Sequence, residues 1–349
     1  MTAAAASASP TGPSPDGPGR TRRAIAVVGP HILDVLGRPV EAIPPGQGSA
    51  RLTEIKATAA GTAAGTAVDL AKLGASVSCF GAVGTDLLAD ILLAALTAQG
   101  IDTCGLVRTA AAQTSATILP IRPNGERPAL HVPGATRQLR AADLDLSRLA
   151  RFQALVLGGP DALTGLAGVD LTAVVAAAKG SGALVLVDTL HPGNRADFER
   201  LSGALALADW FCPNSDQLLA LTGSDGIEQA IGDVLALGTG GVAVTLGGEG
   251  CLVTSGGDLL HVPAIAVDVV DTTGCGDAFD AGMLTGLMSG CSPADAAWLG
   301  AACGSLVATG LGSDAGLQSL GQALDFVASA NIEAAARIAA ATSEKERAI

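Results

Sequence analysis

The sequence predicts an α/β protein in which a doubly wound, mostly parallel sheet is flanked by helices. Apolar runs of strand length, each followed within two residues by Gly or Asp, occupy residues 24–28, 154–157, 183–187 and 242–245. Helical patterns alternate with these runs, at residues 63–73, 86–98, 170–179 and 277–289. Continuous apolar runs are typical of strands that are buried on both faces, and their alternation with helices is typical of a parallel sheet. We therefore expect ligands to bind at the carboxyl ends of the strands.

The composition of the 349-residue chain fits one large domain or two smaller ones and excludes several classes of protein. A hydrophobic content of 49% and a charged content of 15% exclude a wholly disordered chain. The net charge of −13 repels phosphate backbones, and the absence of Tyr leaves little aromatic surface for stacking bases, so no nucleic-acid partner is expected. The apolar runs are far shorter than the roughly 20 residues that span a bilayer, so no membrane partner is expected either.

The ends of the chain and its cysteines bear on organisation and compartment. Residues 1–22 are rich in Ala, Ser, Pro and Gly and lack the apolar core of a secretory signal, so they predict a disordered tail. The segment 332–349 predicts an Ala-rich helix that runs into a charged tail over 341–349. The seven Cys residues are scattered and never spaced as CxxC, which favours a reducing, cytoplasmic location over structural zinc.

Two stretches, residues 38–58 and 114–133, break the alternation of strand and helix. Neither shows helical periodicity, and the second contains Asn124-Gly125 between two β-prone runs, a strong hairpin signal. Together they predict a small β-sheet that covers the main domain. The alternative is a pair of long surface loops, although unstructured loops beyond about 15 residues are uncommon.

The segment 271–283 carries the clearest chemical signal. It follows a strand-like run, 265–270, and places Gly274 and Gly276 before a helix whose first turn contains Asp277. Unsatisfied N–H groups at a helix start can hold a phosphate that larger side chains would block. Asp277 fits such a site if it faces a substrate hydroxyl and takes its proton during phosphoryl transfer. The alternative is that Asp277 only caps the helix and that the glycines form a turn.

Other catalytic classes find little support in the sequence. No GxxxxGK[ST] segment is present, which excludes the common phosphate-loop NTPases as a model. No GxSxG segment is present, and the four His residues are widely separated along the chain, so a hydrolase triad is poorly supported.

The segment 271–282, DTTGCGDAFDAG, closely resembles the C-terminal signature of the ribokinase-like (PfkB) carbohydrate kinases. Further segments resemble motifs of that family in the same order, at residues 27–34, 60–74, 81–86, 124–135, 209–217 and 244–250. The resemblance spans about residues 24–325 and implies a kinase domain over 23–340, with residues 38–58 and 114–133 as its lid. In several relatives such a lid also serves as a dimer surface, so a homodimer through the lid is implied.

The resemblance implies ATP-dependent phosphorylation of a hydroxyl on a sugar or sugar-like metabolite. Asp277 would be the general base, and the backbone of Gly274, Cys275 and Gly276 would stabilise the transferring phosphoryl group. The remaining implied site residues are Asp34, Gly61, Gly65 and Thr136 at positions facing the substrate and Asn214, Thr245, Gly247 and Gly250 at positions facing ATP. Mg²⁺ would bridge ATP phosphates largely through water, with Asn214 and Gln217 in its shell. Asp271 and Thr273 would hold K⁺, as in relatives that use it, or would only form a turn.

Several residues depart from the family pattern and leave the acceptor open. Gly65 and Thr136 stand where relatives usually have sugar-binding Asn residues, and Gln217 replaces a usual Glu. Cys275 replaces a usual Ala; a thiol at a helix start is expected either to have a lowered pKa or simply to fill a small space. A nucleoside kinase is therefore an alternative, although aromatic residues to enclose a base are few. A non-catalytic, ligand-binding relative is a second alternative, against which the retention of Asp277 argues.

Overall fold

The computed structural model describes residues 24–347 of the chain, with side chains described as far as Glu344. Its larger sheet has nine strands in the order β13-β12-β11-β10-β9-β8-β1-β4-β5. Their bounds are β1 (Ala24–Val28), β4 (Ser76–Gly84), β5 (Asp102–Thr109), β8 (Ala154–Gly158), β9 (Leu184–Asp188), β10 (Trp210–Phe211), β11 (Val242–Thr245), β12 (Cys251–Thr254) and β13 (Leu260–Val262). The strands from β5 to β11 pair in parallel, and β12 and β13 add an antiparallel edge. The predicted fold class is confirmed.

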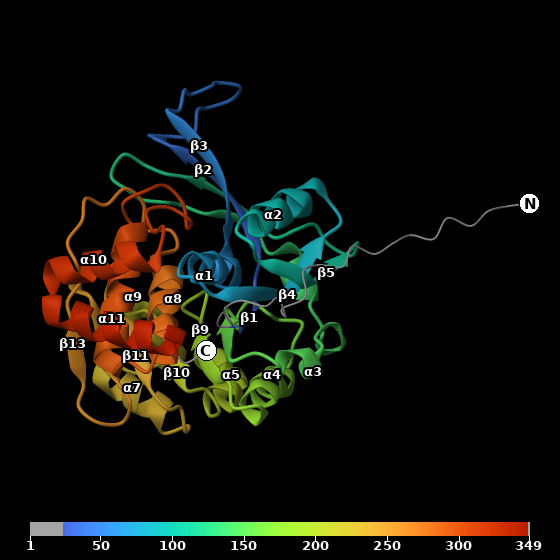
Figure 1. The fold of residues 1–349 in the computed structure, drawn as a ribbon. Helices are drawn as coiled ribbons and strands as arrows, with labels where there is room; N and C mark the ends of the chain where they lie inside the picture. Colours follow the sequence, from blue (N-terminus) through green and yellow to red (C-terminus); the bar gives the residue numbers. More distant parts are fainter. Residues whose placement is uncertain (1–23, 348–349) are drawn as a thin grey trace, which may run out of the picture.

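Helices cover both faces of this sheet (Figure 1). One apolar core joins it to α1 (Gly61–Lys72), α2 (Leu87–Ala98), α8 (Cys275–Met288), α9 (Pro293–Val307), α10 (Leu320–Ala330) and α11 (Ile332–Arg347). A second core joins it to α3 (Leu146–Leu149), α4 (Gly168–Gly180), α5 (Arg195–Leu205), α6 (Ser215–Thr222) and α7 (Ile227–Leu235). The pleat explains the two cores: in β1, Ile25 and Val27 enter the first, whereas Ala26 and Val28 enter the second.

A separate four-stranded sheet stands above the main body, where β2 and β3 are labelled in Figure 1. Its order is β3-β2-β6-β7, with β2 (Ile32–Arg38), β3 (Glu54–Ala60), β6 (Ala116–Pro120) and β7 (Leu130–Val132). The hairpin predicted at Asn124-Gly125 is present: β6 and β7 pair antiparallel, and Gly125 adopts a φ of +84° that suits Gly. The small sheet begins at Ile32, before the segment predicted from residue 38, because the chain leaves the large sheet at Gly29 and Pro30 and then enters β2.

Two further segments differ from, or lie beyond, what the sequence predicts. Residues 265–270 were expected to form a strand, but they form none; their apolar side chains line a cavity, and Val269 is 61% exposed. At the C-terminus, α11 continues to Arg347, through most of the segment predicted as a charged tail. The tail predicted over residues 1–22 lies outside the described residues. Within residues 24–347, no helix is both long and apolar enough to cross a membrane.

Candidate active site

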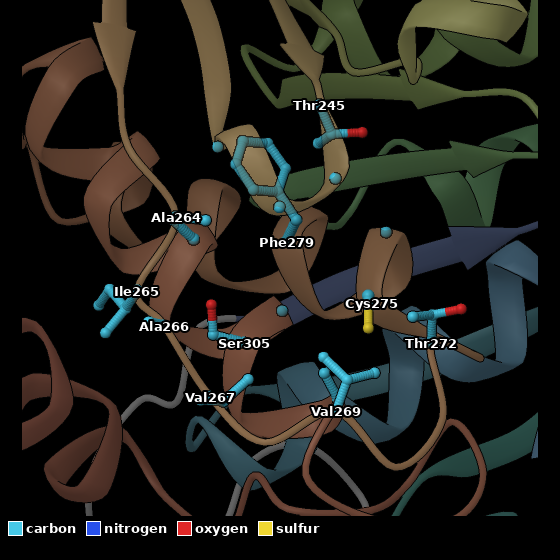
Figure 2. A pocket seen from close by; sticks show the side chains of 17 residues that line it. Thr245, Ala264, Ile265, Ala266, Val267, Val269, Thr272, Cys275, Phe279 and Ser305 are labelled. Carbon is cyan, nitrogen blue, oxygen red and sulfur yellow. The ribbon is translucent and has the colours of Figure 1, made fainter. Parts of the chain in front are cut away.

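Two cavities of similar size meet at the N-terminus of α8. The apolar cavity, about 360 Å³, lies between segment 264–269 on one side and α8 and α9 on the other, with Cys275, Phe279 and Ser305 in its wall (Figure 2). The polar cavity, about 350 Å³, lies between the small sheet, the strand ends of the large sheet and the same helix start. Thr245, Thr272 and Gly276 line both. A molecule in one cavity can therefore contact a molecule in the other.

The turn into α8 places backbone N–H groups at this junction. Gly274 is the N-cap and has a φ of +82°; a Cβ atom there would lie 2.5 Å from the Cα atom of Ser313, so only Gly fits. Within the described chain, the N–H groups of Gly276 and Asp277 donate to no protein acceptor. A Cβ atom on Gly276 would meet nothing within 4 Å, so open space lies in front of these donors. The arrangement suits an anion at the positive end of the helix dipole.

Asp277 lies beside this junction and faces the polar cavity. Burial, together with the nearby charge of Asp34, raises the pKa of Asp277 to about 6, and the Arg127 guanidinium acts in the opposite direction. The carboxylate packs against α1 at Gly65, where a Cβ atom would overlap Oδ2 of Asp277 and lie 2.8 Å from its Cγ atom. Asp277 is therefore a carboxylate with a pKa close to neutrality, in a fixed position at the cavity wall.

Asp34 approaches the polar cavity from the opposite side, on β2 of the small sheet. Burial raises its pKa to about 6, while a hydrogen bond from Thr117 and the charge of Arg127 partly offset this increase. Arg127 extends from the β6–β7 connection, and its Nε atom donates to Oγ1 of Thr272 at 3.2 Å. The cavity therefore has a carboxylate on each of two sides and one guanidinium between the two sheets.

The residues expected at the nucleotide and metal positions fall into two groups. Thr245, Gly247 and Gly250 line the apolar cavity, whereas Asn214 and Gln217 line the polar one. Asn214 and Gln217 also cap α6: the N–H of Gln217 donates to Oδ1 of Asn214 and the N–H of Asn214 donates to Oε1 of Gln217, each at 2.8 Å. Nε2 of Gln217 donates to the carbonyl oxygen of Thr189 at 2.7 Å. The amide that replaces the usual carboxylate is thus used as a donor within the protein.

Asp271 organises the loop that precedes α8. Its Oδ1 atom accepts from the N–H and the hydroxyl of Thr273, at 3.0 and 2.8 Å. Its Oδ2 atom accepts from the N–H of Gly312 at 2.9 Å. These three hydrogen bonds account for a buried carboxylate and fix the turn.

Three of the expected residues have surroundings that the sequence did not indicate. Burial raises the pKa of the Cys275 thiol to about 12, which contradicts a lowered pKa at the helix start and supports the space-filling interpretation. Thr136 does not line the polar cavity; its hydroxyl lies 2.6 Å from that of Ser115, in the wall of a smaller neighbouring cavity. Gly61 lines the polar cavity, but Gly65 lies behind Asp277 and outside the lining.

Sequence reasoning missed several polar residues that line the polar cavity, among them Thr117, Arg127, His131 and His191. Arg127 and His131 flank the predicted hairpin, so the hairpin signal could have indicated them. His191 follows β9, and only the expectation that ligands bind at strand ends could have selected it.

The family assignment follows from comparison with known proteins. The model of the pfkB family carbohydrate kinases matches residues 22–320, nearly the whole of the described chain. The chain belongs to the PfkB family of carbohydrate kinases. This PfkB protein is thus an ATP-dependent carbohydrate kinase, and the resemblance of the 271–282 signature is confirmed.

Relatives of this PfkB kinase include sugar kinases from plants and bacteria. A fructokinase of Klebsiella pneumoniae is 30% identical over 310 residues, which cover 83% of this chain and 94% of the relative. Fructokinase-2 of Zea mays is 28% identical over 288 residues, which cover 78% of this chain and 85% of the relative.

Solved structures share the fold at lower identity. Ribokinase of Arabidopsis thaliana, complexed with ribose and ATP, has a TM-score of 0.75 and 23% identity and covers 88% of this chain and 99% of that chain. An E. coli protein assigned as a ribokinase II, solved with ATP and Mg²⁺, has a TM-score of 0.73 and 22% identity. The match covers 87% of this chain and 98% of that chain. A nucleoside kinase of Methanocaldococcus jannaschii has a TM-score of 0.70 and 21% identity. The match covers 89% of this chain and 100% of that chain.

Proposed function

We propose that this kinase transfers the γ-phosphoryl group of ATP to a hydroxyl of a sugar or sugar-like metabolite, with Asp277 as general base. The observation that carries the proposal is the meeting of two cavities at the start of α8, beside Asp277 and two N–H groups without protein acceptors. The apolar cavity suits the nucleotide, and the polar cavity suits a hydroxyl-rich acceptor.

In the proposed reaction the acceptor hydroxyl lies against Asp277 in the polar cavity. Asp277 takes the hydroxyl proton as the oxygen forms a bond to the γ-phosphorus, and the bond from that phosphorus to the β,γ-bridging oxygen breaks to release ADP. The backbone of Gly274, Cys275 and Gly276 stabilises the charge on the phosphoryl oxygens. A base with a pKa of about 6 is mostly ionised at neutral pH and still binds a proton well.

We propose that Asn214, Thr245, Gly247 and Gly250 contact the nucleotide, with Mg²⁺ neutralising phosphate charge. Among the described residues, no group of three or more His, Cys, Asp or Glu side chains could hold a metal ion. Mg²⁺ usually keeps several of its waters, and Asn214 and Gln217, which line the polar cavity, would be the protein residues of its shell. Asp271 and Thr273 would be the K⁺ residues, although their hydrogen bonds already account for the turn.

The nature of the polar cavity favours a sugar over a nucleoside. Its described lining includes no Phe or Trp, so no large aromatic side chain is available there to enclose a base. Asp34, Asp277 and several hydroxyl groups instead offer hydrogen-bond partners for sugar hydroxyls.

A screen of ADP release tests the proposal. The protein would be assayed with ATP and Mg²⁺ against neutral sugars, sugar acids, sugar phosphates and nucleosides, in K⁺ and in Na⁺ buffers. We expect ADP release that depends on a sugar or sugar derivative and stops when Mg²⁺ is chelated. Release confined to nucleosides would contradict the proposed acceptor, and equal rates in K⁺ and Na⁺ would remove the K⁺ role of Asp271 and Thr273.

We also propose a homodimer through the outer face of the small sheet. Val35, Ile118 and Leu130 are cross-strand neighbours on one face, and Ile118 and Leu130 are 59% and 58% exposed. Contiguous exposed apolar side chains on a sheet are typical of an interface. Sedimentation of the wild type and of an Ile118→Lys variant would test this: a dimer that the substitution dissociates supports it, and a monomeric wild type contradicts it.

A further inference from the structure

A side cavity of about 140 Å³ adjoins the polar cavity. The two share the lining residues Ile32, His131, Leu190 and His191. The side cavity lies on the far side of these residues from the start of α8, toward Arg137 and Asp161. An acceptor held against Asp277 can therefore extend a group into it.

Three basic side chains converge on the side cavity from distant parts of the sequence. His131 comes from β7, Arg137 from the short helix after it, and His191 from the segment that follows β9. Burial lowers the pKa of His131, and the nearby charges of His191 and Arg137 lower it further. Within the described chain, neither Arg137 nor His131 forms an ion pair with a carboxylate. The charge and donors of Arg137 therefore remain available to a ligand.

Asp161 is the acidic residue among the described residues lining the side cavity, and both of its carboxylate oxygens accept hydrogen bonds within the protein. Its Oδ1 atom accepts from the N–H of Leu190 at 2.8 Å, and its Oδ2 atom accepts from the N–H of His191 at 3.0 Å and from Nδ1 of His191 at 2.9 Å. This ion pair raises the pKa of His191. The His191 imidazolium then keeps Nε2–H as a donor. Asp161 therefore orients the His191 cation at the cavity, and its own negative charge is paired rather than left to repel an anionic ligand.

The opposite end of the acceptor site carries the opposite charge. Asp34 and Asp277 line the polar cavity and supply this charge, whereas burial raises the pKa of the neighbouring Asp188 well above its ordinary value. Between the two ends, the Thr117 hydroxyl is hydrogen-bonded to Asp34, and it lies 3.0 Å from Nδ1 of His131. The site is therefore acidic where a hydroxyl would lose its proton and basic where the acceptor would end.

We infer that the side cavity is a subsite for an anionic group, a carboxylate or a phosphate, at the end of the acceptor opposite the hydroxyl that is phosphorylated. The preferred substrate is then an acidic sugar derivative rather than a neutral sugar. This inference rests on the proposed function and specifies its substrate class. An anion at the other end of the site would face the carboxylates, so the charge distribution also fixes the direction in which the acceptor binds.

Matched acceptors test the subsite. Values of kcat/KM would be measured for a neutral sugar, the corresponding sugar acid and the corresponding monophosphate, with wild type, Arg137→Gln and His191→Asn. In His191→Asn, the Asn side-chain amide retains a donor in the position of Nδ1 of His191, and the charge of the imidazolium is removed. For at least one acidic acceptor we expect a preference of about tenfold over the neutral sugar, and a loss of about tenfold in each variant. Arg151→Gln, which changes an exposed Arg outside all three cavities, is the control and should have no effect.

The outcomes separate the subsite from the proposed function. Preference for the sugar acid identifies a carboxylate as the ligand, and preference for the monophosphate identifies a phosphate. Equal or better use of the neutral sugar, or equal losses for neutral and acidic acceptors in Arg137→Gln, overturns the subsite while the kinase activity stands. If no acceptor releases ADP, the proposed function fails. In that case the affinity of wild type and of Arg137→Gln for the same sugar acid and monophosphate would be measured by calorimetry. Weaker binding by Arg137→Gln supports the subsite, and identical binding of both ligands to the two proteins overturns it.

Discussion

Gly65 of α1 lies directly behind the carboxylate of Asp277 of α8. A Cβ atom on Gly65 would overlap Oδ2 of Asp277 and lie 2.8 Å from its Cγ atom. The missing side chain therefore has a positive role, because it leaves the space into which the proposed base packs. At this position, where the resemblance implies a sugar-binding Asn, the chain instead leaves room for the carboxylate of Asp277.

The Gly65→Ala variant is expected to lose activity by moving Asp277. A displaced catalytic group can cost about 100-fold in rate, so we expect a fall in kcat of about that size with little change in the KM for ATP. Steady-state kinetics would measure it. Gly232→Ala is the matched control, because Gly232 also lies in a helix but a Cβ atom there meets nothing within 4 Å. Full activity in Gly65→Ala would show that the contact does not position Asp277.

Removing the charge of Asp277 should abolish turnover and leave the fold intact. General-base catalysis contributes about 10²–10⁴-fold, so we expect kcat of Asp277→Asn to fall by at least that lower figure. Nucleotide binding should remain near normal, and Tm at pH 7 should be unchanged or higher, because burial disfavours the charged form. Kinetics, calorimetry and thermal unfolding would be compared with Asp325→Asn on α10. Activity of Asp277→Asn comparable to that of wild type would contradict the assignment of the base.

Activity should fall on the acidic side of pH 6. The pKa of Asp277 is raised to about 6, so the base is ionised above that pH and becomes protonated below it. On the acidic limb of the pH–rate profile, below pH 6, we expect kcat/KM to decrease about tenfold per pH unit. Asp34 titrates in the same range and interacts with Asp277, so the limb belongs to the pair. A profile that stays flat down to pH 4.5 would contradict a base of raised pKa.

Arg127 should affect both carboxylates at once. Its charge lowers the pKa of Asp34 and of Asp277, so Arg127→Gln should move the acidic limb to higher pH. It should also reduce kcat, because a guanidinium beside Thr272 can stabilise charge on the transferring group. Arg122→Gln, on the same hairpin and ion-paired with Glu126, is the control for the pH profile. An unshifted limb in Arg127→Gln would show that this guanidinium does not act on the pair.

Restoring the usual Glu at position 217 should destabilise this protein. Nε2 of Gln217 donates to the carbonyl oxygen of Thr189 at 2.7 Å, and a carboxylate there would place two acceptors together. We expect Gln217→Glu to lose about 1–3 kcal/mol of unfolding free energy, measured in urea. The exposed Gln153→Glu serves as the control. Unchanged stability with tighter Mg²⁺ dependence would instead indicate that the position serves the metal.

The sequence predicted the site best where its chemistry is contiguous. Gly274, Gly276 and Asp277 stand within four residues at the start of one helix, so local rules for helix termini were sufficient. Asp34 belongs to segment 27–34, which resembles a family motif, but its place on β2 depends on pairing with β3 and β6, which decides where the chain goes after Pro30. Local pattern contains no information about such pairing.

The wrong prediction of a strand at residues 265–270 arises because the same apolar pattern occurs both in buried strands and in cavity walls. Residues 265–270 are apolar and β-prone, as a buried strand would be, but their side chains line a cavity. His131 and His191 are 60 positions apart and gave no pattern; β7 and the end of β9 bring them to the same cavity. Only the three-dimensional arrangement shows that two isolated histidines form a cluster with Arg137.

The lining of the cavities divides along the chain. The described lining of the apolar cavity lies wholly between Thr245 and Ala308, whereas that of the side cavity lies wholly between Pro30 and His191. Recombination with a relative upstream of β11 would therefore exchange the lining of the side cavity, while the described lining of the apolar cavity is inherited intact. A chimera joined between α7 and β11 should therefore keep its apolar cavity and change its side cavity.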